Sequence, residues 1–316
     1  MAGVTNKPTK KSGLNKASAG LLAGILLLVA LGYLPGWLGA SGWRDLVRPA
    51  QADARQGTLR VHFIDVGQGD SILIQAQGEA MLIDGGERGQ EETVIAYLKA
   101  QGVAELRYVV ATHPHSDHIG GLAYGVLAAF PVREVIAPRL PESGIAVTRT
   151  YEAFLTAVNT LVQEQDTKAT SAQPGQTYQL GDAVFTILGP LAASDNVNNN
   201  SVVLRLEYGA FALLLTGDAE SAAETQLIER WGAALDADLM KAGHHGSNTS
   251  STLRLLELVT PEAVVISCGA GNSYGHPHPA ILDRLLSLGV QIYRTDLEGS
   301  LVFDTDGDGF WREEAA

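Results

Sequence analysis

The chain has 316 residues, of which 46% are hydrophobic, so its length allows one large domain or two of ordinary size. Its formal net charge is −13 at pH 7, and four lysines within residues 1–40 leave residues 41–316 with 18 basic and 35 acidic side chains. This acidity excludes a general polyanion-binding surface, because non-specific nucleic-acid affinity comes mainly from neutralising phosphates. The only cysteine, Cys268, excludes an intramolecular disulfide framework and cysteine-rich zinc modules.

The first 57 residues indicate a targeting segment followed by a linker. After a basic tail at 1–16, residues 17–40 (ASAGLLAGILLLVALGYLPGWLGA) contain no charged side chain, which suits the roughly 20 residues that cross a bilayer. Lysines before this run predict a cytoplasmic tail, a single transmembrane anchor and the rest of the chain outside the cell membrane. The alternative is a signal peptide cleaved near residues 50–54, which would give a secreted protein. Residues 41–57 are expected to be a linker.

Residues 58–316 are expected to form one mixed β/α domain. Its first half predicts strands at 59–66, 71–76, 79–86, 106–113 and 134–138, with helices over 91–102 and 147–165. Its second half predicts a hairpin at 202–220, a helix near 220–231, a strand and loop at 237–247, a strand at 262–269, a helix over 279–290 and closing strands over 299–313. Two successive β/α halves favour two packed sheets with helices outside.

Three histidines and an aspartate lie within six positions of ATHPHSDHIGGL, residues 111–122. His113 and His115 are two residues apart, so an extended loop points both rings to one side. Asp117 and His118 follow where a helix is expected to start, and there they turn toward a second point. Imidazole is the commonest protein ligand for metals, so this segment predicts a site for one or two cations.

Two later segments end apolar strands in further ligand-type residues. Asp218 closes LLLTGD and is placed to bridge two cations, and His244 and His245 follow another strand. Adjacent residues at a strand end face opposite ways, so we expect one ligand and one supporting or substrate-facing histidine. Asp84 in LIDGG is either an outer carboxylate that orients a histidine or a turn residue.

THPHSDHIGG resembles the HxHxDH signature of the metallo-β-lactamase fold. Six further segments resemble, in order, those of one branch of this fold, the extracellular C-terminal domain of ComEC-type competence proteins and their stand-alone relatives. They are FIDVGQGDSILIQ and LIDGG before the signature, and NNNSVVLRL, LLTGDAE, KAGHHGSNTSS and SYGHPHP after it. The resemblance covers roughly residues 59–305. It implies an α/β fold, the αββα metallo-β-lactamase sandwich, here preceded by the N-terminal transmembrane helix, with metals at one edge of the two sheets.

The resemblance also implies the ligands. His113 and His115 match the ligands of the first metal, and Asp218 matches the carboxylate that bridges the two metals. The ligands of the second metal are matched by Asp117, His118 and His245, with His244 as the alternative to His245. Many enzymes of the fold place a third first-site histidine before the Asp218 strand, where this chain has NVNNNSVV. An asparagine oxygen or water then completes that site, or it is weak or empty. Fewer imidazoles shift the preference from Zn²⁺ toward Mn²⁺.

These features predict an exported hydrolase that cleaves phosphodiesters with a metal-activated hydroxide, as a ComEC-like nuclease or phosphodiesterase. The expected partners are a phosphodiester substrate, with DNA among the candidates, and the membrane. The alternatives are another ester hydrolase of this fold, or a non-catalytic membrane-tethered module that binds DNA through a degenerate metal site. The expected catalytic residues are Asp117, His245 and His276, and the expected outer or substrate-contacting residues are Asp84, Asp65, Asp70, Asn200, His244, Ser247 and His278. For His276 and His278, a proline-stiffened helix entry is an equally weighted reading.

Overall fold

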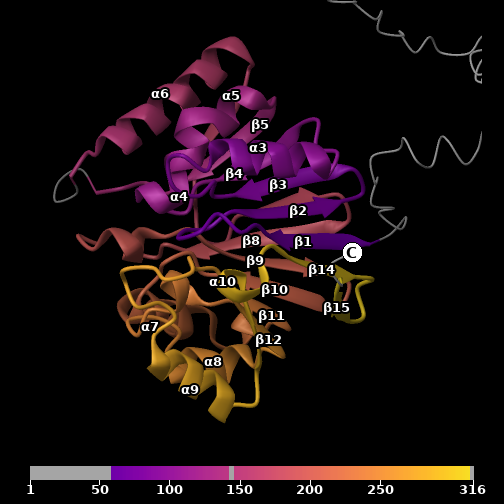
Figure 1. The fold of residues 1–316 in the computed structure, drawn as a ribbon, viewed down its shortest axis with the longest axis vertical. Coiled ribbons are helices and arrows are strands. Elements are labelled where there is room, and N and C mark those ends of the chain that lie inside the picture. The colour runs from indigo at the N-terminus through magenta and orange to yellow at the C-terminus, as the bar shows by residue number, and fades with distance from the viewer. Residues whose placement is uncertain (1–57, 142–145, 314–316) are drawn as a thin grey trace, which may run out of the picture. The chain divides into compact units, whose positions relative to one another are not determined.

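The computed structural model describes residues 58–141 and 146–313 (Figure 1). The predicted basic tail, membrane segment and linker, at 1–16, 17–40 and 41–57, lie outside the described residues. Within the described ranges, no helix combines the length and apolar character needed to cross a bilayer.

The first sheet has eight strands in the order β15-β14-β1-β2-β3-β4-β5-β6. Neighbours from β15 to β3 pair antiparallel, and those from β3 to β6 pair parallel. These strands are β1 (Leu59–Phe63), β2 (Ile72–Ala76), β3 (Glu79–Ile83), β4 (Leu106–Val110), β5 (Val132–Ala137), β6 (Lys168–Ser171), β14 (Leu301–Thr305) and β15 (Phe310–Arg312). Its outer face is covered by α3 (Glu91–Ala100), the run α4 (Ser116–Gly121), η1 (Leu122–Val126) and α5 (Leu127–Ala129), and α6 (Arg149–Glu164).

The second sheet has seven strands in the order β13-β12-β11-β10-β9-β8-β7. Neighbours from β7 to β10 pair antiparallel, and those from β10 to β13 pair parallel. These strands are β7 (Thr177–Leu180), β8 (Ala183–Gly189), β9 (Val203–Tyr208), β10 (Phe211–Leu215), β11 (Leu239–Lys241), β12 (Ala263–Ile266) and β13 (Gln291–Arg294). Its helical segments are η2 (Val197–Asn200), α7 (Ser221–Trp231), η3 (Gly232–Leu235), η4 (Gly243–Gly246), α8 (Leu253–Val259), α9 (Pro279–Ser287) and α10 (Thr295–Glu298).

The two sheets pack face to face, with α3 to α6 on one side and α7 to α9 on the other (Figure 1). Strand alternation explains the layers. In β2, Ile72 and Ile74 join the core between the sheets, whereas Leu73 joins the core under the helices. The aromatic rings of Phe63 and Phe303 meet edge to face in the central core. The predicted two-sheet sandwich is therefore confirmed.

The predicted helix at 147–165 is α6, whose first turn is capped where the Tyr151 amide donates to the Thr148 hydroxyl. The main departures from the expected elements are four strands that were not predicted. Strands β6 and β7 are short, polar and largely exposed and so lack an apolar run, whereas β8 and β13 were missed although β8 is seven residues long and largely buried. Strand β3 stops before Asp84, whose φ of +57° turns the chain out of the sheet.

Helix α4 packs backbone to backbone against the loop that follows β3. The Gly121 amide donates to Gly86 O at 2.9 Å, and the Gly85 amide donates to His118 O at 2.7 Å. A Cβ on Gly121 would lie 1.9 Å from Gly85 O, and one on Gly120 would lie 2.2 Å from Arg88 N. The two glycines of HIGG therefore permit the close approach between this helix and the loop that carries Asp84.

We expect Gly121→Ala to lower the free energy of unfolding by about 2–3 kcal/mol, because the new methyl group meets rigid backbone. Urea denaturation followed by circular dichroism measures the change. Gly309→Ala is the control, because a Cβ there meets nothing within 4 Å. Equal losses in the two variants would show that backbone crowding at Gly121 is not the cause.

Candidate metal centre

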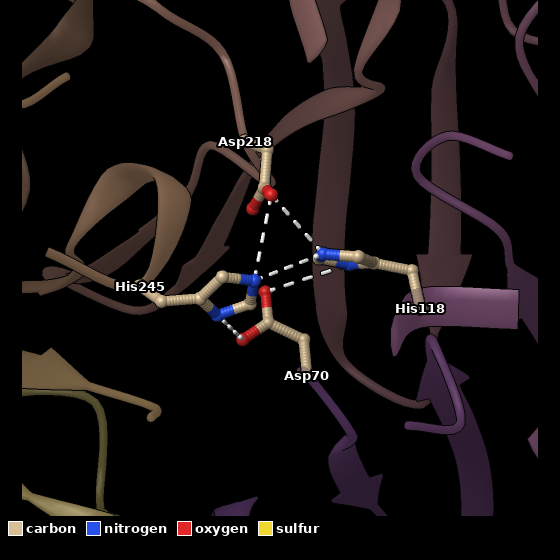
Figure 2. Close-up of side chains that lie close together, drawn as sticks. All are labelled: Asp70, His118, Asp218 and His245. Atoms are coloured by element: carbon tan, nitrogen blue, oxygen red, sulfur yellow. Dashed lines mark hydrogen bonds and ion pairs between the residues drawn. The ribbon is translucent and has the colours of Figure 1, made fainter. Parts of the chain in front are cut away.

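Three imidazoles converge on one carboxylate oxygen at an edge of the sandwich. Asp218 Oδ2 lies 3.7 Å from His113 Nε2, 3.2 Å from His118 Nε2 and 3.4 Å from His245 Nε2. All four side chains are buried. His113 follows β4 and His118 lies in the first turn of α4, whereas His245 lies in η4 and Asp218 follows β10. The carboxyl ends of strands from both sheets therefore build the cluster. Figure 2 shows Asp218 with His118, His245 and Asp70.

The other ring nitrogens of His118 and His245 are held from outside the cluster. His118 Nδ1 lies 2.7 Å from Asp84 Oδ2, and His245 Nδ1 lies 3.0 Å from Ser267 O. Asp84 in turn accepts the Thr112 amide at 2.8 Å and the Thr112 hydroxyl at 2.6 Å. Since a carbonyl only accepts, His245 Nδ1 carries a proton, and both rings present Nε2 to Asp218. This outer support is typical of metal-binding histidines.

The buried charges perturb one another strongly. Burial alone would lower the pKa of His118, but the Asp218 and Asp84 carboxylates raise it well above its usual value. The pKa of His245 is raised in the same way, against burial, by Asp218 and Asp70. Burial would raise the pKa of Asp218, yet His118 and His245 hold it well below its usual range. Without a metal, protonated imidazoles therefore balance the carboxylates.

A divalent cation fits these residues. One ligand atom from each of Asp70, His118, Asp218 and His245 lies within 4.8 Å of the others. Asp218 Oδ1 and Asp70 Oδ1 are buried and accept no hydrogen bond within the described structure. Buried carboxylates whose oxygens lack donors are costly, and a cation held by the Asp218 carboxylate and the imidazoles would offset the negative charge of both carboxylates.

Two other predicted ligands lie at the rim of the cluster. His115 is exposed, and its Nδ1 lies 3.0 Å from His113 Nε2. Asp117 Oδ2 lies 3.4 Å from His245 Nε2. Burial would raise the pKa of Asp117, but the positive charges of His118 and His245 lower it below its usual range. The HxHxDH segment thus places His113 and His118 against Asp218, and Asp117 against His245.

His244 and His245 divide their roles, but the predicted reason is wrong. Strand β11 ends at Lys241, and both histidines have left-handed backbone, with φ of +49° and +54°. His245 is buried in the cluster, whereas the His244 side chain is 23% exposed. His244 Nε2 lies 3.8 Å from Asp218 Oδ2, and its Nδ1 lies 3.4 Å from Glu220 Oε1. The turn, rather than strand alternation, separates the rings.

The cluster opens into a cavity of about 250 Å³, which is lined by Gln68, His115, Ser116, Asp117, Asp218, His244, His245, Tyr274 and His276. Tyr274 is 68% exposed, and its ring stacks on His276 with centroids 5.7 Å apart. Burial lowers the pKa of His276 to about 4, helped by the positive charge of His245. His276 is therefore a neutral group at the mouth, and its Nδ1 has no hydrogen-bond partner in the described structure.

Several expected outer residues serve local structure instead. Asp65 Oδ1 accepts the Gly67 amide at 3.0 Å in the turn after β1. His278 is the N-cap of α9, where its Nδ1 accepts the Ala280 amide at 3.2 Å, so the helix-entry reading holds for His278. Ser247 Oγ pairs with a threonine hydroxyl in the loop after η4 at 3.0 Å.

Where many enzymes of the fold have a third histidine for the first metal, this chain has the asparagine segment 196–200, which forms part of a closed loop. The Asn200 side chain accepts the Ser194 amide at 2.9 Å and donates to Ser194 O at 2.7 Å, so its amide is fully used away from the cluster. Asn198 lies nearer, with Nδ2 3.5 Å from the His244 ring nitrogens and Oδ1 buried without a partner in the described structure. The Asn198 oxygen, rather than Asn200, is the available acceptor on this side.

The sequence reasoning missed Lys241, the first residue of KAGHHGS. Its side chain is 1% exposed, and Nζ lies 2.5 Å from Asp70 Oδ2 and 3.7 Å from Asp218 Oδ1. Burial would lower its pKa, but Asp70 and Asp218 raise it above its usual value, and Lys241 helps to hold the pKa of Asp70 at about 2 against burial. The sequence feature that could have revealed it is a charged residue that ends an apolar strand three residues before a pair of histidines.

Comparisons with known proteins agree with this geometry. The family described as the metallo-beta-lactamase superfamily matches residues 64–270. Competence protein ComA of Neisseria gonorrhoeae is 32% identical over 294 residues, covering 89% of this chain and 37% of that protein. ComE operon protein 3 of Bacillus subtilis is 29% identical over 262 residues, covering 77% of this chain and 32% of that protein. The chain thus spans about a third of the length of these curated relatives.

Solved structures show the same fold. The metallo-beta-lactamase fold protein YhfI from Bacillus subtilis superposes with a TM-score of 0.53 at 15% identity, covering 78% of this chain and all of that one. Igni18, a metallo hydrolase from Ignicoccus hospitalis, superposes with a TM-score of 0.50 at 16% identity, covering 78% of this chain and 98% of that one. With the family matched over well more than half of its length, and competence proteins among its homologues, the chain belongs to the metallo-beta-lactamase superfamily.

Proposed function

We propose that the chain is a metal-dependent hydrolase that cleaves phosphodiesters. The observation that carries the proposal is the convergence of three imidazole Nε2 atoms on Asp218 Oδ2, beside a buried Oδ1 that accepts no hydrogen bond in the described structure. His118 and His245 each have their other ring nitrogen engaged from outside the cluster, so these donor atoms are preorganised for a cation.

We assign the ligand roles by the match of these residues to the HxHxDH signature and the segments that follow it. His113 and His115 would hold one cation, and Asp117, His118 and His245 would hold the other, with Asp218 shared between them. Imidazole with carboxylate oxygen suits Zn²⁺ and Mn²⁺. When bound, such a cation supplies an activated water and stabilises the negative charge that develops on a phosphodiester.

The residues around the opening would bind and orient the substrate. His244 and His276 line the cavity beside Asp218, where neutral imidazoles can exchange hydrogen bonds with phosphate oxygens. Tyr274 offers an exposed aromatic face at the same mouth, and aromatic faces stack on nucleic-acid bases without sequence preference. This arrangement supports a nucleotide-containing diester.

DNA is the substrate that the relatives favour. Two of them are named as a competence protein and a product of the ComE operon, and a third, from Haemophilus influenzae, is named Recombination protein 2. Because residues 41–316 are strongly acidic, DNA would be attracted locally by the bound cations rather than by the whole surface. We also propose the location predicted above, with the domain outside the membrane that residues 17–40 would cross.

We expect Asp218→Ala to reduce metal-dependent turnover by about a thousandfold or more, because it removes the oxygen on which all three imidazoles converge. The full chain is stripped with a chelator, given back Mn²⁺ or Zn²⁺, and assayed in parallel on bis-p-nitrophenyl phosphate, single-stranded DNA and double-stranded DNA. Asp182→Ala is the matched control, since this exposed aspartate lies in the β7–β8 turn. Turnover that survives both chelation and Asp218→Ala contradicts the proposal.

The same assay separates the alternatives. Cleavage of the small diester without cleavage of DNA would favour a small-molecule or cell-wall substrate. Stoichiometric metal binding without turnover of any substrate would favour the non-catalytic DNA-binding module. The latter draws its support from the missing third histidine, in whose place Asn200 is tied into its own loop.

We also expect the metal-free protein to lose stability as the pH rises from 6.5 into the alkaline range. His118 and His245 have pKa values raised above 6.5, so their contribution is fully present below that value and is lost as the pH rises through the raised pKa. Deprotonation removes the imidazolium partners of the buried carboxylates and leaves Asp70 and Asp218 only the Lys241 ammonium. The thermal midpoint measured in chelator and in excess Mn²⁺ from pH 6 to pH 9 tests this. A metal-free midpoint that rises with pH would refute it.

A further inference from the structure

Lys241 places a buried ammonium behind the candidate metal centre. It is the last residue of β11, and its Nζ contacts Asp70 Oδ2 at 2.5 Å, Gly217 O at 3.2 Å and Asp218 Oδ1 at 3.7 Å. The ammonium is within hydrogen-bond distance of Asp70 Oδ2 and Gly217 O, and Asp218 Oδ1 lies farther away, at ion-pair distance. A fully buried lysine persists only when its charge is paired in this way.

Asp70 meets the two central imidazoles on the side away from the convergence point. Its Oδ2 lies 3.8 Å from His118 Nδ1, and its Oδ1 lies 3.5 Å from His245 Nδ1. Both of these nitrogens already have closer outer partners, at 2.7 Å and 3.0 Å. Asp218, by contrast, meets both Nε2 atoms. In the view of Figure 2, Asp218 lies above the two rings and Asp70 below them.

The backbone fixes Asp70 in this place. Its amide donates to Asp117 O at 3.1 Å, and its carbonyl accepts the Gly86 amide at 2.8 Å. Gly69, with φ of +129°, brings the preceding residue so close that a Cβ would lie 2.2 Å from Asp117 O. The Asp70–Lys241 pair therefore links a rigid loop of the first sheet to a strand end of the second.

We propose that Lys241 is a positioning residue that decides which carboxylate oxygens are left for the metal. By binding Asp70 Oδ2 it keeps Asp70 out of the ligand set, and by lying beside Asp218 Oδ1 it leaves Asp218 to bind through Oδ2. This inference rests on the proposed metal site. It assigns a positioning role to a residue that itself supplies no ligand atom to the cation.

The charge balance predicts whether each substitution strengthens or weakens cation binding. Among the described residues, Lys241 is the only lysine or arginine within ion-pair distance of Asp70 or Asp218. Removing its charge makes the site more negative and should strengthen cation binding, while it releases both carboxylates from their fixed positions. Removing the charge of Asp70 leaves the ammonium uncompensated and should weaken cation binding.

The test compares Lys241→Met, Asp70→Asn and the double variant in the full chain. Mn²⁺ alone is titrated by calorimetry, and kcat is measured with bis-p-nitrophenyl phosphate. We expect Lys241→Met to tighten Mn²⁺ binding and Asp70→Asn to weaken it, each by about tenfold. Both should lower kcat by about 10- to 100-fold, because the ligands lose their orientation. The double variant, which buries neither charge, should return to within about threefold of the wild-type affinity.

Arg60→Met and Asp304→Asn are the matched controls. They break a different, largely buried ion pair, in which two Arg60 nitrogens each donate to Asp304 at 2.6 Å between β1 and β14. We expect them to lower thermal stability without changing Mn²⁺ affinity or kcat.

Three results would overturn the inference. Weaker Mn²⁺ binding in both single variants would mean that the pair only supports the fold. A double variant as weak as Asp70→Asn would mean that Asp70 binds the ion directly. A wild-type chain that binds no Mn²⁺ or Zn²⁺ would overturn the proposed metal site and this inference together, whereas the first two results leave the metal site standing.

Discussion

The organisation of this protein depends on the carboxylate of Asp218. Its Oδ2 is the point on which His113, His118 and His245 converge, and its Oδ1 lies beside the ammonium of Lys241. The residue lies three positions after the end of β10, a wholly buried strand, and its backbone amide donates to the Ser201 hydroxyl at 3.1 Å. Its backbone is therefore held in place. The partners must be delivered to it by other strands.

The two-sheet sandwich makes that delivery possible. The dry core between the sheets fixes the spacing of their strands, and the parallel strands of both sheets end at the same edge. Each strand end then contributes a polar group whose burial the others offset. Asp84 and Ser267 O hold the rings from behind, and imidazoles or a cation balance the carboxylates. Stability and metal binding are coupled here because the same buried charges determine both.

The opening of the site differs in character from its base. At the base the charged groups are buried, whereas His244, His276 and Tyr274 line an open cavity on segments that follow β11 and precede α9. The left-handed turn at His244 and His245 joins the two regions, since it directs one ring inward and the other toward the opening. Loops with exposed aromatic and imidazole groups on a rigid frame are suited to substrate recognition.

The sequence by itself determined the fold class and most of the cluster. Apolar runs of strand and helix length favoured two packed sheets, and the resemblance to the metallo-β-lactamase fold implied the sandwich. HxHxDH, Asp218 and the histidine pair are local patterns that follow recognisable strands. The sequence did not reveal the polar edge strands β6 and β7, the strands β8 and β13, or that Asp65 and Asn200 serve a turn and a loop. Nor did it reveal Lys241. A lysine at a strand end is normally exposed, and only the packing of two sheets, which buries its ammonium between Asp70 and Asp218, gives it a role. Such a role depends on residues about 170 positions apart in the chain, and local sequence patterns carry no information about that contact.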